Sequence, residues 1–313
     1  MVTGGCGFIG SHLVRELLRL GAARIVVVDS LRYGTRANLG APDSRVEILE
    51  HTLGHDPPEA LAAALAGVDC LFHLAAEKHN QSKDEPSRVY RSNVEGTHVL
   101  CDLACRSGVR KIVFSSSLYA YGRMHGEPFV ETEAPRPRTV YGISKLAGEH
   151  IVAHLAEQAG IAHAVLRYLF VYGPRQFAGL GYRSVIIKSF ERILRGESPV
   201  VYGDGRQQLD YVFVNDAVDA TIRAMELDLS DETINIGSGV ATPVEALVDR
   251  MLQVSGSSVE KLREPPDWTA GSSRVADTSK AKRLLGWSAS TSLDEGLSRT
   301  YRFLIESAVE AAP

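Results

Sequence analysis

A tyrosine and a lysine four residues apart, Tyr141 and Lys145, form the first candidate site in the sequence. Residues at this spacing lie on one face of a helix, where the lysine ammonium can lower the pKa of the phenol until it becomes a usable base. Upstream, Ser115-Ser-Ser117 ends a β-branched run, and a hydroxyl there can share the same substrate oxygen. A Tyr-x-x-x-Lys pair alone is more often an ordinary surface pair, so its meaning depends on the rest of the chain.

Glycines dominate the start of the chain, in Val2-Thr-Gly-Gly-Cys-Gly-Phe-Ile-Gly10, directly before an amphipathic segment. Glycine permits a tight turn and close approach of the backbone to a pyrophosphate, whose charge then lies at a helix N-terminus. Asp29 ends the next apolar run, 19 residues after Gly10, where a carboxylate can accept hydrogen bonds from ribose hydroxyls. A carboxylate there would repel a 2′-phosphate, so the pattern favours NAD over NADP; Arg32 weakens this preference without reversing it.

These residues must be positioned by regular elements, and β-branched runs alternate with helical stretches along the first half of the chain. Buried strands are predicted at 24–29, 68–73, 111–115 and 164–167, with helices at 11–20, 58–66, about 86–106 and 142–159. Further on, we predict a helix at 184–194, strands at 200–202 and 210–213, a helix at 215–226, a strand at 233–236 that returns to the main sheet, and a helix at 277–286 ended by glycine.

The predicted fold is therefore α/β, with a Rossmann, doubly wound parallel sheet and a smaller C-terminal α/β substrate lobe. Residues 1–168 and 202–237 are assigned to the NAD-binding Rossmann domain. Residues 169–201 and 238–313 are assigned to the substrate-binding lobe.

The composition excludes several other classes of protein. The 313 residues carry 34 basic and 38 acidic side chains, for a net charge of −4, so nothing indicates a nucleic-acid partner. No apolar run reaches the roughly 18 residues of a membrane span, and the N-terminus lacks the features of a signal peptide, so a cytoplasmic protein is expected. The four cysteines lack metal-site spacing. The pairs His51/His55 and His150/His154 could bind zinc at helical spacing but have no third ligand nearby, so a solvated surface position is favoured and no metal is expected.

Beyond these features, the sequence resembles the extended short-chain dehydrogenase/reductases of the nucleotide-sugar epimerase and dehydratase family, and most of all the UDP-sugar 4-epimerases. The matching motifs run in family order over nearly the whole chain: Thr3-Gly-Gly-Cys-Gly-Phe-Ile-Gly10, Phe72-His-Leu-Ala-Ala76, Ser92-Asn-Val-Glu-Gly-Thr97, Ser115-Ser-Ser117, Tyr141-x-x-x-Lys145, Leu166-Arg-Tyr168, Tyr172-Gly-Pro174, Tyr202-Gly-Asp-Gly205, Asn235-Ile-Gly237, and Ala276-Asp277 through Gly286-Trp287.

The resemblance implies a role for each matched residue. Tyr141 is expected to be the base, Lys145 its activator and nicotinamide-ribose ligand, and Ser117 the hydroxyl that orients the substrate oxygen. The mechanism implied is oxidation of a sugar carbinol, in which Tyr141 takes the hydroxyl proton as hydride passes to NAD. The implied cofactor contacts are Gly4, Gly7, Phe8, Ile9, Gly10, Asp29, Leu53, Leu74, Ala75, Ala76, Lys78, Asn93, Ser115, Tyr141 and Lys145.

The fate of the resulting ketone distinguishes members of the family. The 4,6-dehydratases carry a Thr-Asp-Glu triplet where this chain has Ser117-Leu118-Tyr119, and decarboxylases carry a glutamate at the Tyr119 position. Leu118 can transfer no proton and Tyr119 replaces a carboxylate poorly, whereas a 4-epimerase needs no further acid or base. The leading hypothesis is therefore a 4-epimerase. The alternatives are an oxidoreductase or dehydratase that acts on a sugar or polyol and binds phosphate in an atypical way, and a non-catalytic NAD-binding sensor.

The substrate end departs from the family pattern. Thr52 stands where an acid near the adenine is usual, Phe170 where an asparagine approaches the substrate diphosphate, and Leu209 where an arginine binds it. Losing a charged donor to a diphosphate costs on the order of 2 kcal/mol, so either another arginine compensates or the substrate is not a usual nucleotide sugar. The candidates for compensation are Arg175, Arg183, Arg206, Arg263 and Arg274, and the expected substrate contacts are His79, Ser82, Ser117, Phe170, Arg183 and Arg263.

Two further expectations follow from the resemblance. A homodimer is expected, in which the helices after Pro86 and Tyr141 form a four-helix bundle with their mates. Cys101, Ala104 and Leu155 would suit its apolar seam, although packing within the chain explains them equally well. Only Met1 and Val2 precede Thr3, so either the first strand is short or an upstream stretch is missing.

Overall fold

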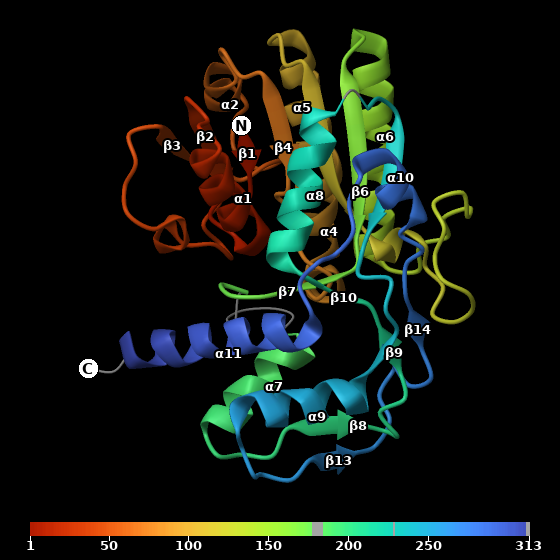
Figure 1. Ribbon diagram of the computed structural model, residues 1–313. Coiled ribbons are helices and arrows are strands. Elements are labelled where there is room, and N and C mark those ends of the chain that lie inside the picture. The colour runs from red at the N-terminus through yellow and green to blue at the C-terminus, as the bar shows by residue number, and fades with distance from the viewer. Residues whose placement is uncertain (177–183, 228, 311–313) are drawn as a thin grey trace.

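A parallel sheet of seven strands forms the centre of the protein, in the order β11-β6-β5-β4-β1-β2-β3 (Figure 1). The computed structural model describes residues 1–176, 184–227 and 229–310. The strands are β1 (Val2–Thr3), β2 (Ile25–Asp29), β3 (Val46–Glu50), β4 (Cys70–His73), β5 (Lys111–Ser117), β6 (Ala162–Tyr168) and β11 (Glu232–Ile236). The predicted Rossmann sheet is confirmed, including the return of the 233–236 segment to its edge, where β11 pairs with β6.

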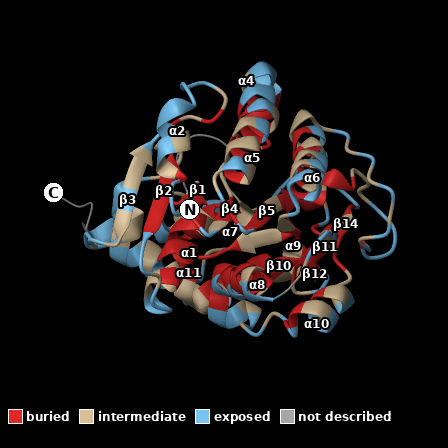
Figure 2. Ribbon diagram, turned by 90° about the horizontal axis from the view of Figure 1, so that it is seen from above, coloured by how far each residue is buried: buried red, intermediate tan, exposed pale blue. Residues whose placement is uncertain are grey.

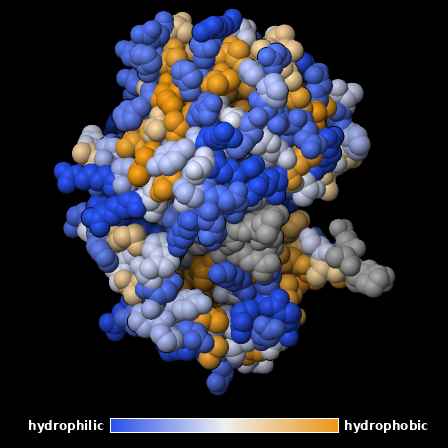
Figure 3. All heavy atoms as spheres, turned by 180° about the vertical axis from the view of Figure 1, so that it is seen from behind, coloured by the Kyte–Doolittle hydropathy of each residue, from blue (hydrophilic) through white to orange (hydrophobic). Residues whose placement is uncertain are grey.

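Helices cover both faces of this sheet (Figure 2). One face carries α1 (Phe8–Arg19), α8 (Val214–Glu226) and α10 (Ser279–Leu285); the other carries α2 (Glu59–Ala64), α5 (Gly96–Arg106) and α6 (Val140–Ala159). Successive strand residues point to opposite faces, so Val27 and Val113 join the core under α1 and α8, while Val28 and Ile112 join the core under α5 and α6. Figure 3 shows the α2–α6 side, where apolar patches lie among charged ones.

A smaller lobe lies beyond the carboxyl ends of the strands. Its helices α7 (Val185–Leu194), α9 (Val244–Ser255) and α11 (Leu293–Glu310) pack together around Phe190, Leu247 and Leu297. Three small sheets complete it: β7 (Phe170–Tyr172) with β10 (Tyr211–Phe213), β9 (Gln208–Leu209) between β12 (Thr242–Pro243) and β14 (Ser273–Arg274), and β8 (Val200–Tyr202) with β13 (Leu262–Glu264). The division of the chain into two domains stays a prediction.

The helix predicted at 86–106 is interrupted. After the short helices α3 (Gln81–Asp84) and α4 (Pro86–Tyr90), the chain makes a π-helical turn at Arg91–Glu95 before α5 begins. Short 3-10 turns occur at Arg36–Leu39 and Leu118–Ala120. The π turn shifts the direction of the side chains that follow it, and such turns are frequent at functional sites.

Two residues expected in a subunit seam lie inside the chain instead. Cys101 and Ala104 face the sheet from α5 and are fully buried in the core that this helix shares with β5 and β6. That part of the seam prediction is wrong, because the helical face they occupy is already covered by the protein's own strands. No helix in the described part of the chain is long and apolar enough to cross a membrane.

Candidate active site

The main pocket of the described structure lies at the carboxyl edge of the sheet, where loops leave β1, β2, β4 and β5. Its lining includes the predicted residues Gly4, Gly7, Phe8, Ile9, Gly10, Asp29, Leu53, Leu74, Ala75, Ala76, Lys78, His79, Ser115, Ser117, Tyr141, Lys145 and Phe170. Residues far apart in the sequence are brought together because parallel strands all end at this edge.

The glycine loop is packed so closely that side chains have no room. A Cβ on Gly10 would lie 2.1 Å from the Gly4 carbonyl oxygen, and one on Gly4, whose φ is +70°, would lie 2.9 Å from the Ala75 amide nitrogen. The first turn of α1 contains no acidic residue, so its free N–H groups favour an anion. The loop therefore fits the pyrophosphate of a dinucleotide.

Asp29 joins the end of β2 to this loop. Its Oδ2 accepts a hydrogen bond from the Cys6 amide at 2.9 Å and its Oδ1 one from the Leu31 amide at 2.8 Å. Burial raises the pKa of this carboxyl, while hydrogen bonds from the backbone of Leu31, Cys6 and Gly7 oppose that rise. The Arg32 guanidinium is already occupied, since it binds Glu85 at 2.7 Å and donates from Nε to the Tyr33 hydroxyl at 2.8 Å. This arrangement fits NAD better than NADP.

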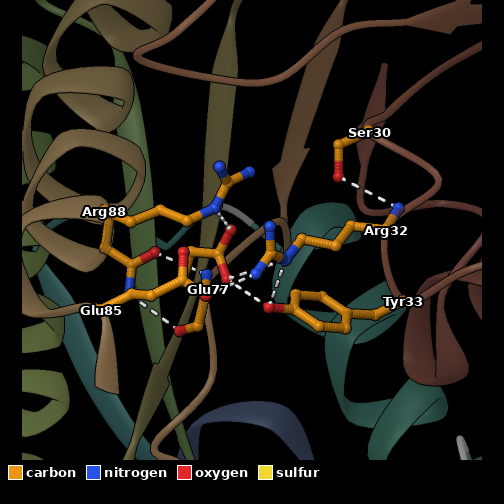
Figure 4. Close-up of polar contacts among 7 residues, drawn as sticks. Ser30, Arg32, Tyr33, Glu77, Glu85 and Arg88 are labelled. Carbon is orange, nitrogen blue, oxygen red and sulfur yellow. Dashed lines mark hydrogen bonds and ion pairs between the residues drawn. The ribbon is translucent and has the colours of Figure 1, made fainter. Parts of the chain in front are cut away.

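Tyr33 and Glu77 form a bridge across the pocket (Figure 4). The Tyr33 hydroxyl donates to Glu77 Oε2 at 2.6 Å, and Arg88 Nε of α4 donates to Glu77 Oε1 at 2.7 Å. Tyr33 follows β2 and Glu77 follows β4, while β1 lies between these strands. The Lys78 ammonium lies 4.6 Å from the centre of the Tyr33 ring, and burial lowers the pKa of Lys78 to about 8. We call the Tyr33–Glu77–Arg88 contact the bridge below.

Asn93 of the π turn holds the loop that carries Glu77. Its amide oxygen accepts the Glu77 N–H at 2.7 Å, and its Nδ2 donates to the Glu77 carbonyl at 3.0 Å and to Ser144 Oγ at 3.0 Å. Asn93 itself does not line the pocket, unlike the other predicted cofactor residues. Its position shows that it orients the loop from behind.

Tyr141, Ser117 and Lys145 meet where β5 and α6 converge. Ser117 is the last residue of β5, and Tyr141 lies in the first turn of α6, whose N-terminus is capped by Thr139 Oγ1 accepting the Gly142 N–H at 3.0 Å. Burial raises the pKa of Tyr141 to about 12, opposed by a hydrogen bond with Ser117. Burial also lowers the pKa of Lys145 to about 7, opposed by Glu149. The expected lowering of the Tyr141 pKa by Lys145 is not found; burial raises this pKa, and the group that opposes the rise is Ser117.

Glu149 is a residue that the sequence reasoning missed. It lies one turn after Lys145 on α6, and Arg167 of β6 binds both of its oxygens, at 2.9 and 2.7 Å. Ser116 Oγ donates to the same carboxylate. The signal was present, since Tyr141, Lys145 and Glu149 follow one another at intervals of four residues and so share one helical face.

Aromatic rings surround the reacting end of the pocket. The His79 ring stacks on Tyr119 with centroids 4.5 Å apart, and Tyr119 meets Tyr141 edge-on at 5.7 Å. Trp268 lies 6.1 Å from His79. Burial, with Lys83 and Arg274 nearby, lowers the pKa of His79 to about 4, so this imidazole is neutral at physiological pH.

Several predicted substrate residues lie elsewhere. Ser82 does not line the pocket, because its hydroxyl donates to the His79 carbonyl within a turn. Arg263 lies on the exposed edge of the lobe, where it binds Glu245 at 2.6 Å. Arg183 lies outside the described residues.

His51, expected on the surface, is buried and lines the pocket with Thr52. Within the described ranges, no group of three or more His, Cys, Asp or Glu could hold a metal ion.

A Rossmann sheet whose first turn forms a glycine-rich dinucleotide loop, with a ribose-binding carboxylate at the end of the second strand, is typical of NAD-dependent enzymes. Residues 1–237 match the model of the NAD dependent epimerase/dehydratase family, and the chain belongs to this family. A solved UDP-glucose 4-epimerase from Thermotoga maritima is 36% identical, with a TM-score of 0.90 and 98% of each chain covered. The UDP-glucose 4-epimerase of Mycolicibacterium smegmatis is 32% identical, with 97% of each chain covered.

NAD is the cofactor of the family. A solved dTDP-glucose 4,6-dehydratase from Streptomyces venezuelae contains it, at 28% identity and a TM-score of 0.89 over 99% of this chain and 97% of that one. Relatives of similar identity include 4-epimerases, dehydratases and decarboxylases alike. Membership of the family therefore identifies the cofactor but does not distinguish among these reactions, which depend on the residues of the site.

Proposed function

We propose that the protein is an NAD-dependent 4-epimerase of a nucleotide sugar. The observation that carries this proposal is the chemistry around Tyr141. Within the described part of the pocket, the lining carboxylates are Asp29 and Glu77, and both are bound by groups on the cofactor side. No carboxylate of the described lining stands beside Tyr141, where a dehydratase or decarboxylase would need one.

The residues that do surround Tyr141 are poor substitutes for a second acid and base. Leu118 is buried and apolar. Burial raises the pKa of Tyr119, so its phenol keeps its proton. His79, with a pKa of about 4, has no proton to give near neutral pH. Removal of water from the ketone is therefore less well supported than simple reversal of the oxidation.

In the proposed reaction the chain's own residues handle the proton. Bound NAD would be held by the glycine loop and Asp29, and supplies a hydride acceptor and donor. Tyr141 Oη takes the proton of the sugar hydroxyl when the carbinol becomes a ketone. It returns the proton when the carbinol forms again with the opposite configuration. Ser117 orients the sugar oxygen, and protonated Lys145 stabilises the phenolate during the transfer.

The reaction is tested by incubating the protein with UDP-glucose, UDP-galactose, UDP-N-acetylglucosamine and UDP-glucuronate and identifying products by NMR. We expect at least one pair to interconvert at C4 without net consumption of NAD. A 4-keto-6-deoxy product would instead establish a dehydratase. Stoichiometric accumulation of NADH would establish a net oxidoreductase, and NAD binding without any turnover would establish a sensor.

We also propose a homodimer formed through α4, α5 and α6. Tyr90 on α4 and Ile143 on α6 are each 42% exposed and lie on neighbouring helices, where a second copy of the chain would cover both. Sedimentation at low micromolar concentration should give twice the monomer mass of 34.0 kDa. Ile143→Glu should shift the population toward the monomer, and Val240→Glu, at an exposed residue of the lobe, should not.

A further inference from the structure

Behind the wall of the pocket, next to Phe170 and Tyr119, lies a buried guanidinium that no carboxylate of the described residues neutralises. Arg274 of β14 is 2% exposed, yet none of the ion pairs among the described residues includes it. Its Nε and Nη1 are buried without a hydrogen-bond partner in the described structure. A buried cation without a counter-ion is costly, so such a group is expected to serve a ligand that brings negative charge.

Arg274 adjoins the pocket through the residues of its wall. Its Cζ lies 4.8 Å from the centre of the Phe170 ring and 5.6 Å from that of Trp268. Its guanidinium also hydrogen-bonds the phenol of Tyr119 and lowers the pKa of that group against the effect of burial. Phe170 and Tyr119 both line the pocket, and Tyr119 separates Arg274 from the reacting Tyr141. The cation thus lies beyond the reacting position.

The strand register gives Arg274 a definite place in the lobe. β14 runs parallel to β9, and Arg274 pairs with Leu209. Residues that pair in register project their side chains on the same side of a sheet. Arg274 of β14 therefore places a positive charge on the side of the sheet where Leu209 of β9 places none.

The other arginines considered from the sequence have different partners. Arg263 binds Glu245, and Arg206 lies by Asp204 at 3.7 Å on the surface. Arg175 donates to the Asn38 carbonyl at 3.0 Å, close to α1. Among the described candidates, Arg274 alone combines burial, unpartnered N–H groups and a position behind the substrate wall.

We propose that Arg274 binds the diphosphate of the nucleotide sugar and replaces, from the neighbouring strand, the arginine absent at Leu209. The fork of N–H donors on a guanidinium matches phosphate oxygens, and its unpartnered Nε and Nη1 gain acceptors when the diphosphate binds. The inference rests on the proposed nucleotide-sugar substrate, but not on the reaction at C4.

The test measures binding rather than turnover. Calorimetry on the NAD-loaded protein compares UDP, which carries the diphosphate, with uridine, which does not. Arg274→Ala should weaken UDP binding about 10- to 100-fold and change uridine binding by less than about two-fold. Arg274→Lys should fall between the two, because a lysine keeps the charge and loses the fork. Melting temperatures identify a variant that fails to fold, and Arg250→Ala controls for the loss of a lobe guanidinium bound elsewhere.

A rescue variant makes the geometry itself testable. Adding Leu209→Arg to Arg274→Ala returns a guanidinium to the same side of the sheet from β9, and should recover most of the UDP affinity. Equal UDP affinity in Arg274→Ala and the unaltered protein would overturn the proposal, as would a loss confined to UDP-glucuronate, which would assign Arg274 to a sugar carboxylate. If Arg274 controls UDP affinity but no sugar is epimerised, the proposed reaction fails while this inference stands.

Discussion

At the scale of single residues, Tyr141 and Lys145 show how strongly desolvation governs the site. Burial raises the pKa of Tyr141 to about 12 and lowers that of Lys145 to about 7, because desolvation disfavours the charged form of each group. Lys145 lies with its ammonium 4.4 Å from the centre of the Phe114 ring, and Glu149 raises its pKa from the next turn of α6. The Glu149 carboxylate, which Arg167 holds in place, therefore helps to keep Lys145 a cation.

The assignment of Tyr141 as the base predicts the effect of removing one oxygen atom. Tyr141→Phe should lower kcat for epimerisation about 10²- to 10⁴-fold, because the hydroxyl that carries the proton is lost. NAD content and melting temperature should change little, since the ring remains in place. Tyr202→Phe makes the same chemical change at an exposed residue and should leave kcat unaltered. Comparable rates for Tyr141→Phe and the unaltered enzyme would show that another group moves the proton.

The spacing of Tyr141 and Lys145 in the sequence predicted that they share one site, but the sequence could not tell which polar side chains are already engaged by partners within the chain. Ser82 and Arg263 have suitable chemistry for a sugar, yet the first is engaged by the His79 carbonyl and the second by Glu245. Such partners depend on rotamers and on the packing of distant segments. From the sequence, five arginines were equal candidates for replacing the missing diphosphate ligand. The pairing of β14 with β9 is what distinguishes Arg274 from the other four.

At the scale of elements, the bridge of Tyr33, Glu77 and Arg88 connects the loops after β2 and β4 with α4. It lies across the edge at which the cofactor is expected to bind, and Asn93 fixes the loop beneath it. Loops that close over a bound ligand slow its release. The bridge is thus placed to retain NAD between turnovers.

Tyr33→Phe should therefore speed the release of NAD. The substitution removes the hydrogen bond that Tyr33 donates to Glu77 and the one that it accepts from Arg32. The bond to the buried carboxylate alone is worth roughly 1.5–3 kcal/mol, which corresponds to about a 10- to 100-fold faster off-rate if that bond is made only in the closed state. Release can be followed by rapid dilution into an NAD-consuming assay. Tyr301→Phe, on α11 of the lobe, is the matched control. An unchanged off-rate would mean that the bridge does not restrain the cofactor.

Periodicity predicted the longer elements and missed those that leave little pattern. The return of β11 was predictable because Thr233–Ile236 is a short β-branched run. The π turn at Arg91–Glu95 was not, since one extra residue in a helical turn hardly alters the apolar spacing. Strands of two residues such as β9 and β14 are defined by their neighbours rather than by their own sequences.

At the scale of the whole molecule, buried neutral histidines make stability depend on pH. Burial lowers the pKa of His12 to about 4 and that of His73 to about 3, and His73 is held between Thr3 and Thr97 at 2.8 and 2.9 Å. Unfolded histidines bind protons from about pH 6.5, so between this pH and the folded pKa the unfolded state binds more protons. The free energy of unfolding must then fall as the pH falls.

The expected slope is up to about 1.4 kcal/mol per pH unit for each such histidine, between roughly pH 6.5 and 4. Denaturant titrations at several pH values measure it. His12→Gln should reduce the slope by about the contribution of one proton, whereas His150→Gln, at an exposed residue of α6, should not. A slope that His12→Gln leaves unaltered would contradict the depressed pKa of His12.

The chain passes repeatedly between the sheet and the lobe. It enters the lobe at β7, returns for α8 and β11, enters again at β12, and returns once more for α10, where Trp287 Nε1 donates to the Asp216 carbonyl of α8 at 3.0 Å. During synthesis on the ribosome, the edge strand β11 and the helix α10 emerge long after the glycine loop. The nucleotide-binding half thus cannot finish folding as an early, separate unit, and its exposed β6 edge must be kept from other nascent chains until most of the protein has been made.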